Sequence, residues 1–324
     1  MKFKIDITDS EKESIYKCFD DIFKRNFWTE GRYVSEFEEK FRSYVGAEAE
    51  AVAASSWTGS SMAVFEYIGV KDETVLVPSN TFMALPLTAI KAGANVEFVD
   101  CNRHDLCMSA EDLEVKIRKY KPKAVVVVHI GGHIAFDIFD IVELCRKNNV
   151  ILIEDCAHAH GAEYRGKKAG TFGIAGAYSF YATKTITTGE GGMLVSNDKK
   201  LIEYAQKYRN YGKFEYEVPG LNYRMNEFSA VLGMWQTEKL RRIVEWKNEK
   251  AKRLDELYKN RVKMPDGMIS GYYKYIVFDQ IENSTGKVYD LPCHKIMKRD
   301  CKLPNTDWVA ENHWCVPLFY KGDE

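Results

Sequence analysis

The chain has 324 residues and carries 46 Lys and Arg against 47 Asp and Glu, so its net charge is −1. This balance gives no bulk attraction to nucleic acid or to an anionic membrane, and we expect neither as a partner. Hydrophobic residues make up 45% and charged residues 29%, which is ordinary for a globular protein with a sizeable core and excludes general disorder.

The sequence also predicts a compartment. No apolar run reaches the roughly 20 residues that a membrane-spanning helix needs, and the first residues lack the apolar stretch of a secretory signal. The eight cysteines form no CxxC pair, and several lie inside apolar runs. We therefore expect reduced thiols in a cytoplasmic protein.

Short β-rich apolar runs alternate with helix-patterned stretches over roughly the first two thirds of the chain. Near-continuous apolar strands of this kind indicate a sheet that is buried on both faces. The alternation predicts an α/β fold with a mostly parallel sheet. The predicted strands are 74–78, 96–99, 124–130, 150–155, 177–181 and 193–196, and the predicted helices are 59–68, 82–92, 110–120, 138–149 and 199–208.

The pattern changes after Gly220. Residues 227–261 have the periodicity of one long amphipathic helix, which would either connect two domains or lie on the surface of the main core. From Met264 onward the segments are short and suit a small α+β lobe. We predict a large domain over residues 1–240 and a small C-terminal domain over 241–324.

The segment YSFYATKTITTGEGGM, residues 178–193, gives the clearest chemical signal. An aromatic strand leads into a turn with a single lysine, Lys184, and then into a loop rich in hydroxyl groups and glycine. A lysine in a loop is usually a solvated surface group. The buried strand, and glycines that let the backbone pass close to a bulky group, favour instead an amine of lowered pKa that forms a Schiff base.

Asp155 ends the predicted strand ILIED, upstream of Lys184. Taken alone, such a residue is more often a helix cap or a loop carboxylate. Beside an amine that forms a Schiff base it suits another role, because pyridoxal 5'-phosphate (PLP) needs a carboxylate next to its pyridine nitrogen. Together, Lys184 and Asp155 predict a PLP site.

Several motifs follow one another along the chain, each weak alone but improbable together: GRYVSEFEEKF, SSWTGS, VPSNTF, GANVEFVD, VVVHIGG, IEDCAHAHGAEYRGKKAG, SFYATKTITTGEGG and GLNYRMNE. On these motifs the chain resembles the DegT/DnrJ/EryC1/StrS family of PLP-dependent aminotransferases, which mostly act on nucleotide-linked keto sugars. The resemblance runs from about Phe27 to Gly233. It implies a fold-type I aminotransferase, with a mostly parallel seven-stranded sheet between helices and a small, shortened C-terminal α+β domain.

The resemblance implies a role for the residues around the cofactor ring. Lys184 matches the lysine that binds PLP and then moves the proton, and Asp155 matches the aspartate that pairs with the pyridine nitrogen. Phe82 matches the aromatic residue that stacks on the ring. His158 stands where the family usually has a Gln that hydrogen-bonds the phenolic oxygen, and an imidazole can donate the same bond.

The resemblance also implies a phosphate site. Ser179 matches the hydroxyl that binds the phosphate, and Thr58 and Gly59 match a loop whose amides hold it at a helix N-terminus. Asn222 matches an asparagine that reaches the phosphate from the other subunit, which implies a homodimer with shared active sites.

Trp57 departs from the family, which has glycine at this position. A bulky side chain is strained at positive φ, so three outcomes are open: Gly59 takes over the turn, Trp57 points into the site and narrows it, or Trp57 packs beside the loop. A second feature, His158 with His160, resembles a metal site. We expect no metal there, because no further ligand set accompanies these residues.

The predicted function is that of a PLP-dependent aminotransferase, which moves an amino group from L-glutamate to the keto group of a nucleotide-linked sugar by a ping-pong mechanism. Glutamate comes from the resemblance alone. Two alternatives remain: an aminotransferase for a cyclitol or another non-nucleotide ketone, which a trimmed C-terminal part would fit, and a catalytically inactive cofactor-binding paralogue. A Rossmann-type dinucleotide binder is excluded, because no strand is followed by GxGxxG.

Overall fold

The computed structural model describes residues 5–46 and 48–320. Its central sheet has the strand order β1-β9-β8-β5-β4-β2-β3. Within this sheet β9 is antiparallel to both of its neighbours, and the other pairs are parallel. The predicted α/β fold with a mostly parallel seven-stranded sheet is confirmed. The strands are β1 (Glu50–Ala54), β2 (Thr74–Pro78), β3 (Asn95–Val99), β4 (Ala124–Val128), β5 (Ile151–Asp155), β8 (Ala175–Ser179) and β9 (Gly192–Ser196).

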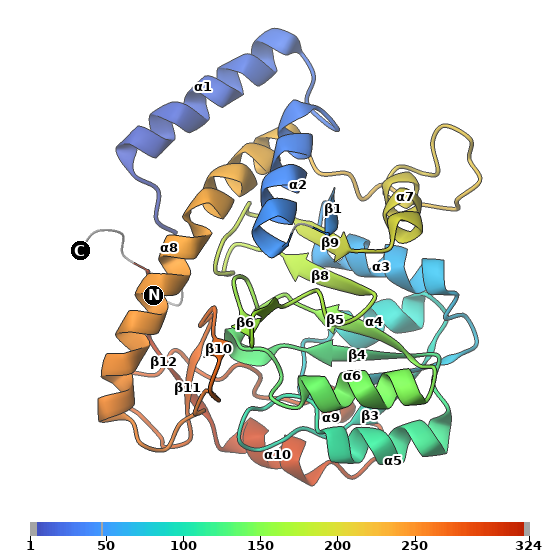
Figure 1. Cartoon of the computed structure of the whole chain (residues 1–324), viewed down its shortest axis with the longest axis vertical. Helices are drawn as coiled ribbons and strands as arrows, with labels where there is room; N and C mark the ends of the chain where they lie inside the picture. The colour runs from blue at the N-terminus through green and yellow to red at the C-terminus, as the bar shows by residue number, and fades with distance from the viewer. Residues whose placement is uncertain (1–4, 47, 321–324) are drawn as a thin grey trace.

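Helices cover both faces of the sheet, with α6 in front of it and α4 behind it in the view of Figure 1. The inner strands are apolar and fully buried, as in the run AVVVV of β4, because a sheet between two helical layers has no wet face. The predicted helices are present with shifts of a few residues at their ends. They are α3 (Trp57–Ile68), α4 (Ala84–Lys91), α5 (Ala110–Tyr120), α6 (Ile138–Lys147) and α7 (Lys199–Tyr208).

The sequence analysis missed the first three elements, which are α1 (Asp9–Arg25), α2 (Arg32–Val45) and β1. Helix α1 begins with a capping box, in which the Thr8 side chain accepts from the Glu11 N–H and the Glu11 carboxylate accepts from the Thr8 N–H. Helix α2 buries one apolar face, which includes Phe37 and Phe41. Strand β1, with the sequence EAVAA, has little of the β-branched character that marks a strand.

Helix α8 (Glu227–Leu257) is a single helix of 31 residues and ends four residues before the predicted limit. It packs against α1 and α2 at one end and extends to the C-terminal strands at the other (Figure 1). Its buried stripe contributes Leu240 to the main core and Ala251 to a second, smaller hydrophobic cluster. The division into domains at residue 240 stays a prediction.

The C-terminal segment forms short elements. These are β10 (Met268–Ile269), β11 (Tyr275–Val277), α9 (Cys293–Ile296), α10 (Pro304–Glu311) and β12 (Trp314–Val316). Strand β11 pairs with β12, and β10 pairs with β6 (Glu163–Tyr164), which pairs with β7 (Lys167–Lys168). Two backbone bonds tie this segment to the turn after β4, because the N–H groups of Gly271 and Lys274 donate to the carbonyls of Gly132 and Gly131.

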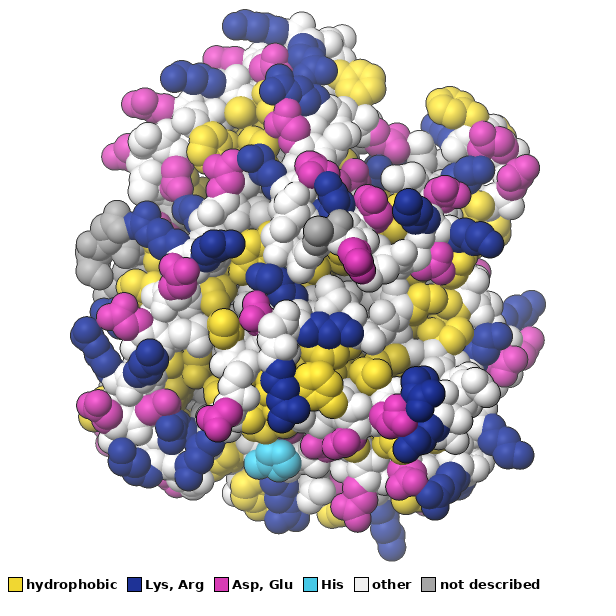
Figure 2. All heavy atoms as spheres, in the orientation of Figure 1, with side chains coloured by type: hydrophobic (Ala, Val, Ile, Leu, Met, Phe, Trp, Pro, Cys, Tyr) yellow, Lys and Arg dark blue, Asp and Glu magenta, His cyan; other side chains and the backbone are white. Residues whose placement is uncertain are grey.

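The surface agrees with the near-zero net charge. Basic and acidic side chains are intermixed over the face shown in Figure 2. All eight cysteines are free, and six of them are buried. In the described part of the chain, no helix combines the length and the apolar content needed to cross a membrane.

Candidate active site at the carboxyl edge of the sheet

Asp155 and Ser179 lie at the ends of neighbouring parallel strands. Asp155 is the last residue of β5 and lies opposite Ala177 of β8, which places Ser179 at the same edge of the sheet. Lys184 follows β8 in a turn closed by its own N–H, which donates to the Tyr181 carbonyl at 2.9 Å. Ligands bind at the carboxyl ends of the strands in open α/β sheets, so this edge is the candidate site.

The Lys184 amine lies in a largely enclosed, cationic setting. Burial lowers its pKa to about 8, the Asp155 carboxylate opposes this shift, and the Lys274 ammonium adds to it. The Lys184 Nζ lies 5.0 Å from the centre of the Tyr273 ring. At neutral pH this amine is therefore deprotonated far more often than an ordinary lysine, as a nucleophile requires.

Asp155 is a buried carboxylate with few donors around it. The Ala157 N–H donates to its Oδ1 at 2.9 Å and is the one donor among the described residues that makes a well-formed hydrogen bond to this carboxyl. Burial raises the pKa of Asp155 to about 6, while the Ala157 N–H and then the Lys184 charge act in the opposite direction. Such a carboxylate is poised to accept from a cationic N–H.

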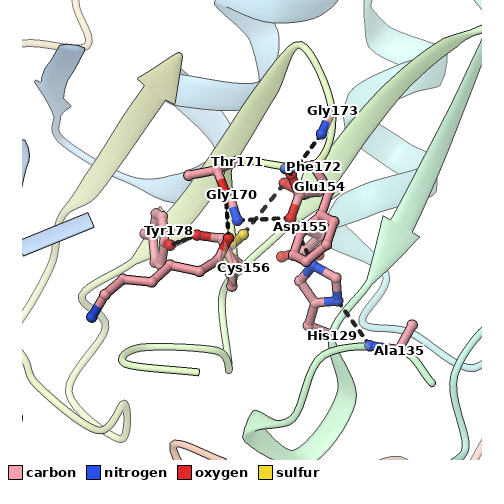
Figure 3. A network of polar contacts seen from close by, with 12 residues as sticks. His129, Ala135, Glu154, Asp155, Cys156, Gly170, Thr171, Phe172, Gly173 and Tyr178 are labelled. Atoms are coloured by element: carbon pink, nitrogen blue, oxygen red, sulfur yellow. Dashed lines mark hydrogen bonds and ion pairs between the residues drawn. The ribbon is translucent and has the colours of Figure 1, made fainter. Parts of the chain in front are cut away.

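Glu154, the preceding residue, is also buried, but several donors surround its carboxylate (Figure 3). Its Oε2 lies 2.9 Å from His129 Nε2. The Ala135 N–H donates to His129 Nδ1 at 3.2 Å, which leaves the imidazole proton on Nε2, facing Glu154. The backbone N–H of His129 donates to the Asp155 carbonyl at 3.1 Å. Glu154 also accepts from three N–H groups of the loop before β8, those of Gly170, Phe172 and Gly173.

The start of helix α3 lies beside Ser179. Gly192 of β9 pairs with Ser179, and a Cβ on Gly192 would lie 2.6 Å from the Trp57 nitrogen. Only glycine allows this approach. The Gly59 N–H is capped by Ser56 Oγ at 3.2 Å, whereas the N–H groups of Trp57 and Thr58 have no partner among the described residues. A helix N-terminus with free N–H groups favours an anion.

Trp57 causes no backbone strain, because it is the first residue of α3 and is not among the described residues with positive φ. Gly59 does not take over a turn, since it lies inside the helix, where its missing Cβ makes room for the Tyr223 ring. The Trp57 ring is buried in the main core. Its indole N–H makes no well-formed hydrogen bond to a described acceptor, yet it lies near enough to the Asp155 carboxyl to lower the pKa of that group.

The remaining predicted residues differ in exposure. Phe82 follows β2 and its side chain is 66% exposed, so its ring is open to a stacking partner. His158 is buried and stacks on the Tyr273 ring, with centroids 4.2 Å apart. Asn222 is exposed, its Oδ1 accepts from the Arg224 N–H at 3.3 Å, and no described contact joins it to Lys184.

The sequence analysis missed three residues of this site: His129, Tyr273 and Tyr289. His129 stands in the motif VVVHIGG, directly after a buried strand, and that position was a usable signal. Tyr273 and Tyr289 lie more than 80 residues after Lys184, and no local motif links either of them to His158. Only the tertiary fold brings them to His158.

The structure also brings together two buried groups of potential metal ligands, which the sequence spacing did not suggest. Hydrogen bonds already engage both. In the first group Asp105 accepts from the Cys107 and Phe136 N–H groups, and His133 Nε2 faces the Asp105 carbonyl. The second group belongs to the Glu154 network described above. The two groups are Asp105, Cys107 and His133, and His129, Glu154 and Cys156.

Comparison with known proteins identifies the family. Residues 9–271 match the model of the DegT/DnrJ/EryC1/StrS aminotransferase family, and the chain belongs to it. It is 37% identical to GDP-perosamine synthase of Escherichia coli O157:H7 over 240 residues, which cover 72% of this chain and 64% of that protein. It is 34% identical to UDP-4-amino-4,6-dideoxy-N-acetyl-beta-L-altrosamine transaminase of Campylobacter jejuni (strain 81-176) over 248 residues, 74% of this chain and 64% of that one. The matches therefore span less than two thirds of these relatives.

Solved structures confirm the fold. The aminotransferase TlmJ from Streptoalloteichus hindustanus superposes with a TM-score of 0.87 at 28% identity, covering 98% of this chain and 93% of that one. A DegT DnrJ EryC1 StrS aminotransferase from Brucella abortus has a TM-score of 0.88 at 23% identity, covering 95% and 90%. The predicted fold-type I architecture, with a large mostly parallel sheet and small antiparallel sheets, is therefore confirmed.

Proposed function

We propose that this protein is a PLP-dependent aminotransferase that moves an amino group from L-glutamate to the keto group of a nucleotide-linked sugar. The observation that carries the proposal is the pairing of Lys184 and Asp155 at one sheet edge, with a lowered amine pKa of about 8 and a raised carboxyl pKa of about 6. Groups with pKa values displaced in this way mark sites of chemistry.

The residues present fit PLP. Its phosphate suits the N–H groups of Trp57 and Thr58 with the Ser179 hydroxyl, because Gly192 brings these groups together. The pyridine nitrogen suits Asp155, which has capacity for a further donor. The exposed ring of Phe82 suits stacking. His158 Nδ1, which is buried without a partner, suits the phenolic oxygen.

Each residue then has a defined task. PLP, when bound, supplies a ring that withdraws electrons from the substrate carbon. Lys184 Nζ would hold the cofactor, and as a free amine it would take the proton from the α-carbon of the amino donor. Asp155 would face the pyridine nitrogen and favour its protonated form. Since both half-reactions use the same lysine, donor and acceptor must alternate at one site, which gives ping-pong kinetics.

The choice of acceptor rests on the relatives. The two proteins compared above are named for GDP-perosamine and for a UDP-linked amino sugar, and this supports a nucleotide-linked keto sugar. L-Glutamate as donor is an expectation for the family. We place the protein in the cytoplasm, with residues 1–240 as the cofactor-binding part and residues 241–324 as the part that closes the site.

We also propose a homodimer with shared active sites. The exposed Asn222 is available to a second chain, and it ends a loop with several exposed apolar side chains. An exposed apolar surface of this kind marks an interaction site. The exposed side chains are Tyr211, Phe214, Tyr216 and Leu221.

The test uses wild-type protein and Lys184→Ala. PLP is added, the sample is reduced with borohydride, and peptides are weighed by mass spectrometry. We expect the cofactor mass on the peptide that contains Lys184, and no attached cofactor in Lys184→Ala. L-Glutamate alone is expected to release 2-oxoglutarate in an amount equal to the bound PLP.

The acceptor is then tested with GDP- and UDP-linked keto sugars, the same sugars without nucleotide, and a cyclitol ketone. Turnover with the nucleotide-linked sugars alone supports the proposal. Turnover with a free ketone alone replaces the nucleotide sugar by a smaller substrate. PLP attachment without release of 2-oxoglutarate rules out glutamate as donor, and absence of attachment supports an inactive paralogue.

A further inference from the structure

Three aromatic rings stack beside Lys184. The His158 ring lies 4.2 Å from the Tyr273 ring, with an interplanar angle of 25°, and 5.8 Å from the Tyr289 ring, with an angle of 19°. The Tyr289 hydroxyl lies 3.4 Å from His158 Nε2. The other imidazole nitrogen, Nδ1, is buried and has no partner among the described residues. His158 therefore has one occupied nitrogen and one open nitrogen.

Tertiary contacts fix both tyrosines. The segment around Tyr273 is bonded to the turn after β4 through the N–H groups of Gly271 and Lys274, at 2.7 and 2.8 Å. The Tyr273 hydroxyl lies 3.2 Å from Thr183 Oγ1, one residue before the lysine. Tyr289 is held from its neighbour, since the Val288 N–H donates to His313 Nε2 at 2.8 Å. Both tyrosines are therefore tied to neighbouring parts of the fold.

The protonation states of the pair follow from their surroundings. Burial lowers the pKa of His158 well below 6.5, so the imidazole is neutral at neutral pH and carries one proton. Burial also raises the pKa of the Tyr289 phenol well above 10, so that group keeps its proton. The nearby charges act in the same directions. They are Lys184, Lys274, His160 and His133 on His158, and Asp155, Tyr273 and Cys293 on Tyr289.

A neutral imidazole is a donor at one nitrogen and an acceptor at the other. The tautomer is set by the partner of the nitrogen that is bonded. The Phe82 backbone lies close enough to the Tyr289 hydroxyl to oppose the rise of its pKa, as a nearby N–H donor does. Because an N–H faces this oxygen, the phenolic proton is free to be donated to His158 Nε2, 3.4 Å away.

We propose that Tyr289 is a positioning residue: its hydroxyl donates to His158 Nε2 and thereby keeps the imidazole proton on Nδ1, the open nitrogen, where it is offered to an acceptor oxygen of the ligand. This inference rests on the proposed function, in which that acceptor is the phenolic oxygen of PLP. If so, His158 can donate in place of the family's usual Gln only because Tyr289, a residue of the C-terminal segment, sets its tautomer.

The first test needs no cofactor. Protein labelled with ¹⁵N-histidine is examined by NMR at pH 8, and His158→Gln identifies the His158 signals. We expect the Nδ1–H tautomer in the wild type and a shift toward the Nε2–H tautomer in Tyr289→Phe. Tyr273→Phe is the matched control: it keeps the stacked ring, removes the hydroxyl bonded to Thr183, and should leave the tautomer unchanged. An Nε2–H tautomer in the wild type overturns the proposal.

The second test measures PLP affinity in a double-mutant cycle. We expect Tyr289→Phe to bind PLP about 3- to 10-fold more weakly than the wild type, because one hydrogen bond to the cofactor is lost. In the His158→Gln background the amide donates without a tautomer, so Tyr289→Phe should have little further effect. Equal losses in both backgrounds contradict the proposal. Failure of wild-type protein to attach PLP to Lys184 instead refutes the proposed function and leaves the NMR result standing.

Discussion

Glu154 and Asp155 are consecutive carboxylates at the end of β5, and they are used in opposite ways. Successive side chains of a strand point to opposite faces, so the two groups enter different surroundings (Figure 3). Glu154 meets three N–H groups and the His129 imidazole. Among the described residues, Asp155 has one well-formed side-chain hydrogen bond, from the Ala157 N–H.

The number of donors separates a structural carboxylate from a chemical one. A buried charge is costly unless hydrogen bonds replace its hydration, and the four donors around Glu154 do so. Asp155 lacks such replacement, and its pKa is raised to about 6. In the ligand-free protein the well-bonded Glu154 thus holds the strand end that carries the poorly solvated Asp155. A cationic nitrogen bound at Asp155 would offset the cost of burying that carboxylate.

The largest effect on stability is expected from removing the Glu154 carboxylate. Glu154→Ala would leave the buried N–H groups of the 170–173 loop and the His129 Nε2–H without acceptors. We expect a loss of about 3–5 kcal/mol in the free energy of unfolding, measured with urea, because breaking a buried network leaves its partners unpaired.

Glu154→Gln is the matched control, since its amide oxygen can still accept and the volume is unchanged. It should lose less than Glu154→Ala. Wild-type stability in Glu154→Ala would show that the network does not hold the strand end, and the contrast with Asp155 would fail.

The opposite change of stability is expected at Asp155. In the folded protein its pKa is about 6, above the unfolded value of about 3.9. Between about pH 3.9 and about pH 6 the folded protein keeps a proton on Asp155 that the unfolded chain has lost. The contribution of this proton to stability is fully present below the unfolded pKa and is lost as the pH rises through about 6. Above pH 6 the ionised group costs the ligand-free protein about 1–3 kcal/mol.

Asp155→Asn removes this cost. We expect the ligand-free variant to melt at a higher temperature than the wild type at pH 8, with a gain about half as large at pH 5, while PLP affinity falls by at least 10-fold. A variant that is less stable than the wild type at pH 8 would show that Asp155 is a structural residue like Glu154.

The sequence predicted the residues at the carboxyl edge of the sheet well, but not the groups that hydrogen-bond to them. Six of the seven strands are runs that need no tertiary information, and only β1 was missed. Asp155 ends one of the predicted strands and Lys184 follows another. Nothing local distinguishes Glu154 from Asp155. The donors to Glu154 come from His129 and from a loop 16 to 19 residues later in the chain, and only the strand order brings them together.

The C-terminal contribution was also out of reach. Tyr273 and Tyr289 belong to the short C-terminal segments, and no local pattern shows that their rings stack on His158. Backbone bonds from Gly271 and Lys274 to the turn after β4 hold the Tyr273 segment there. Trp57 shows the reverse case. The sequence flagged it as a departure, but the predicted difficulty with positive φ disappears because the residue opens a right-handed helix.

The smallest expected effect is a change in the pKa of Asp155 when Trp57 is replaced. Its indole N–H is buried, makes no well-formed hydrogen bond to a described acceptor, and lowers the pKa of the nearby Asp155 carboxyl. Trp57→Phe removes this N–H and keeps an aromatic ring, so the pKa of Asp155 should rise by less than one unit, and stability should change by no more than about 1 kcal/mol.

The pH dependence of unfolding separates this effect from repacking. In ligand-free Trp57→Phe, the pH range over which Asp155→Asn gains stability should move upward, whereas a purely structural change shifts the melting temperature equally at all pH values. Trp57→Gly restores the family residue and serves as the contrast, because it loses the N–H and also leaves a cavity in the core. If Trp57→Phe leaves the pH range unmoved, the indole only packs beside the loop, and the single N–H of Ala157 is the whole of the donor set that keeps Asp155 distinct from Glu154.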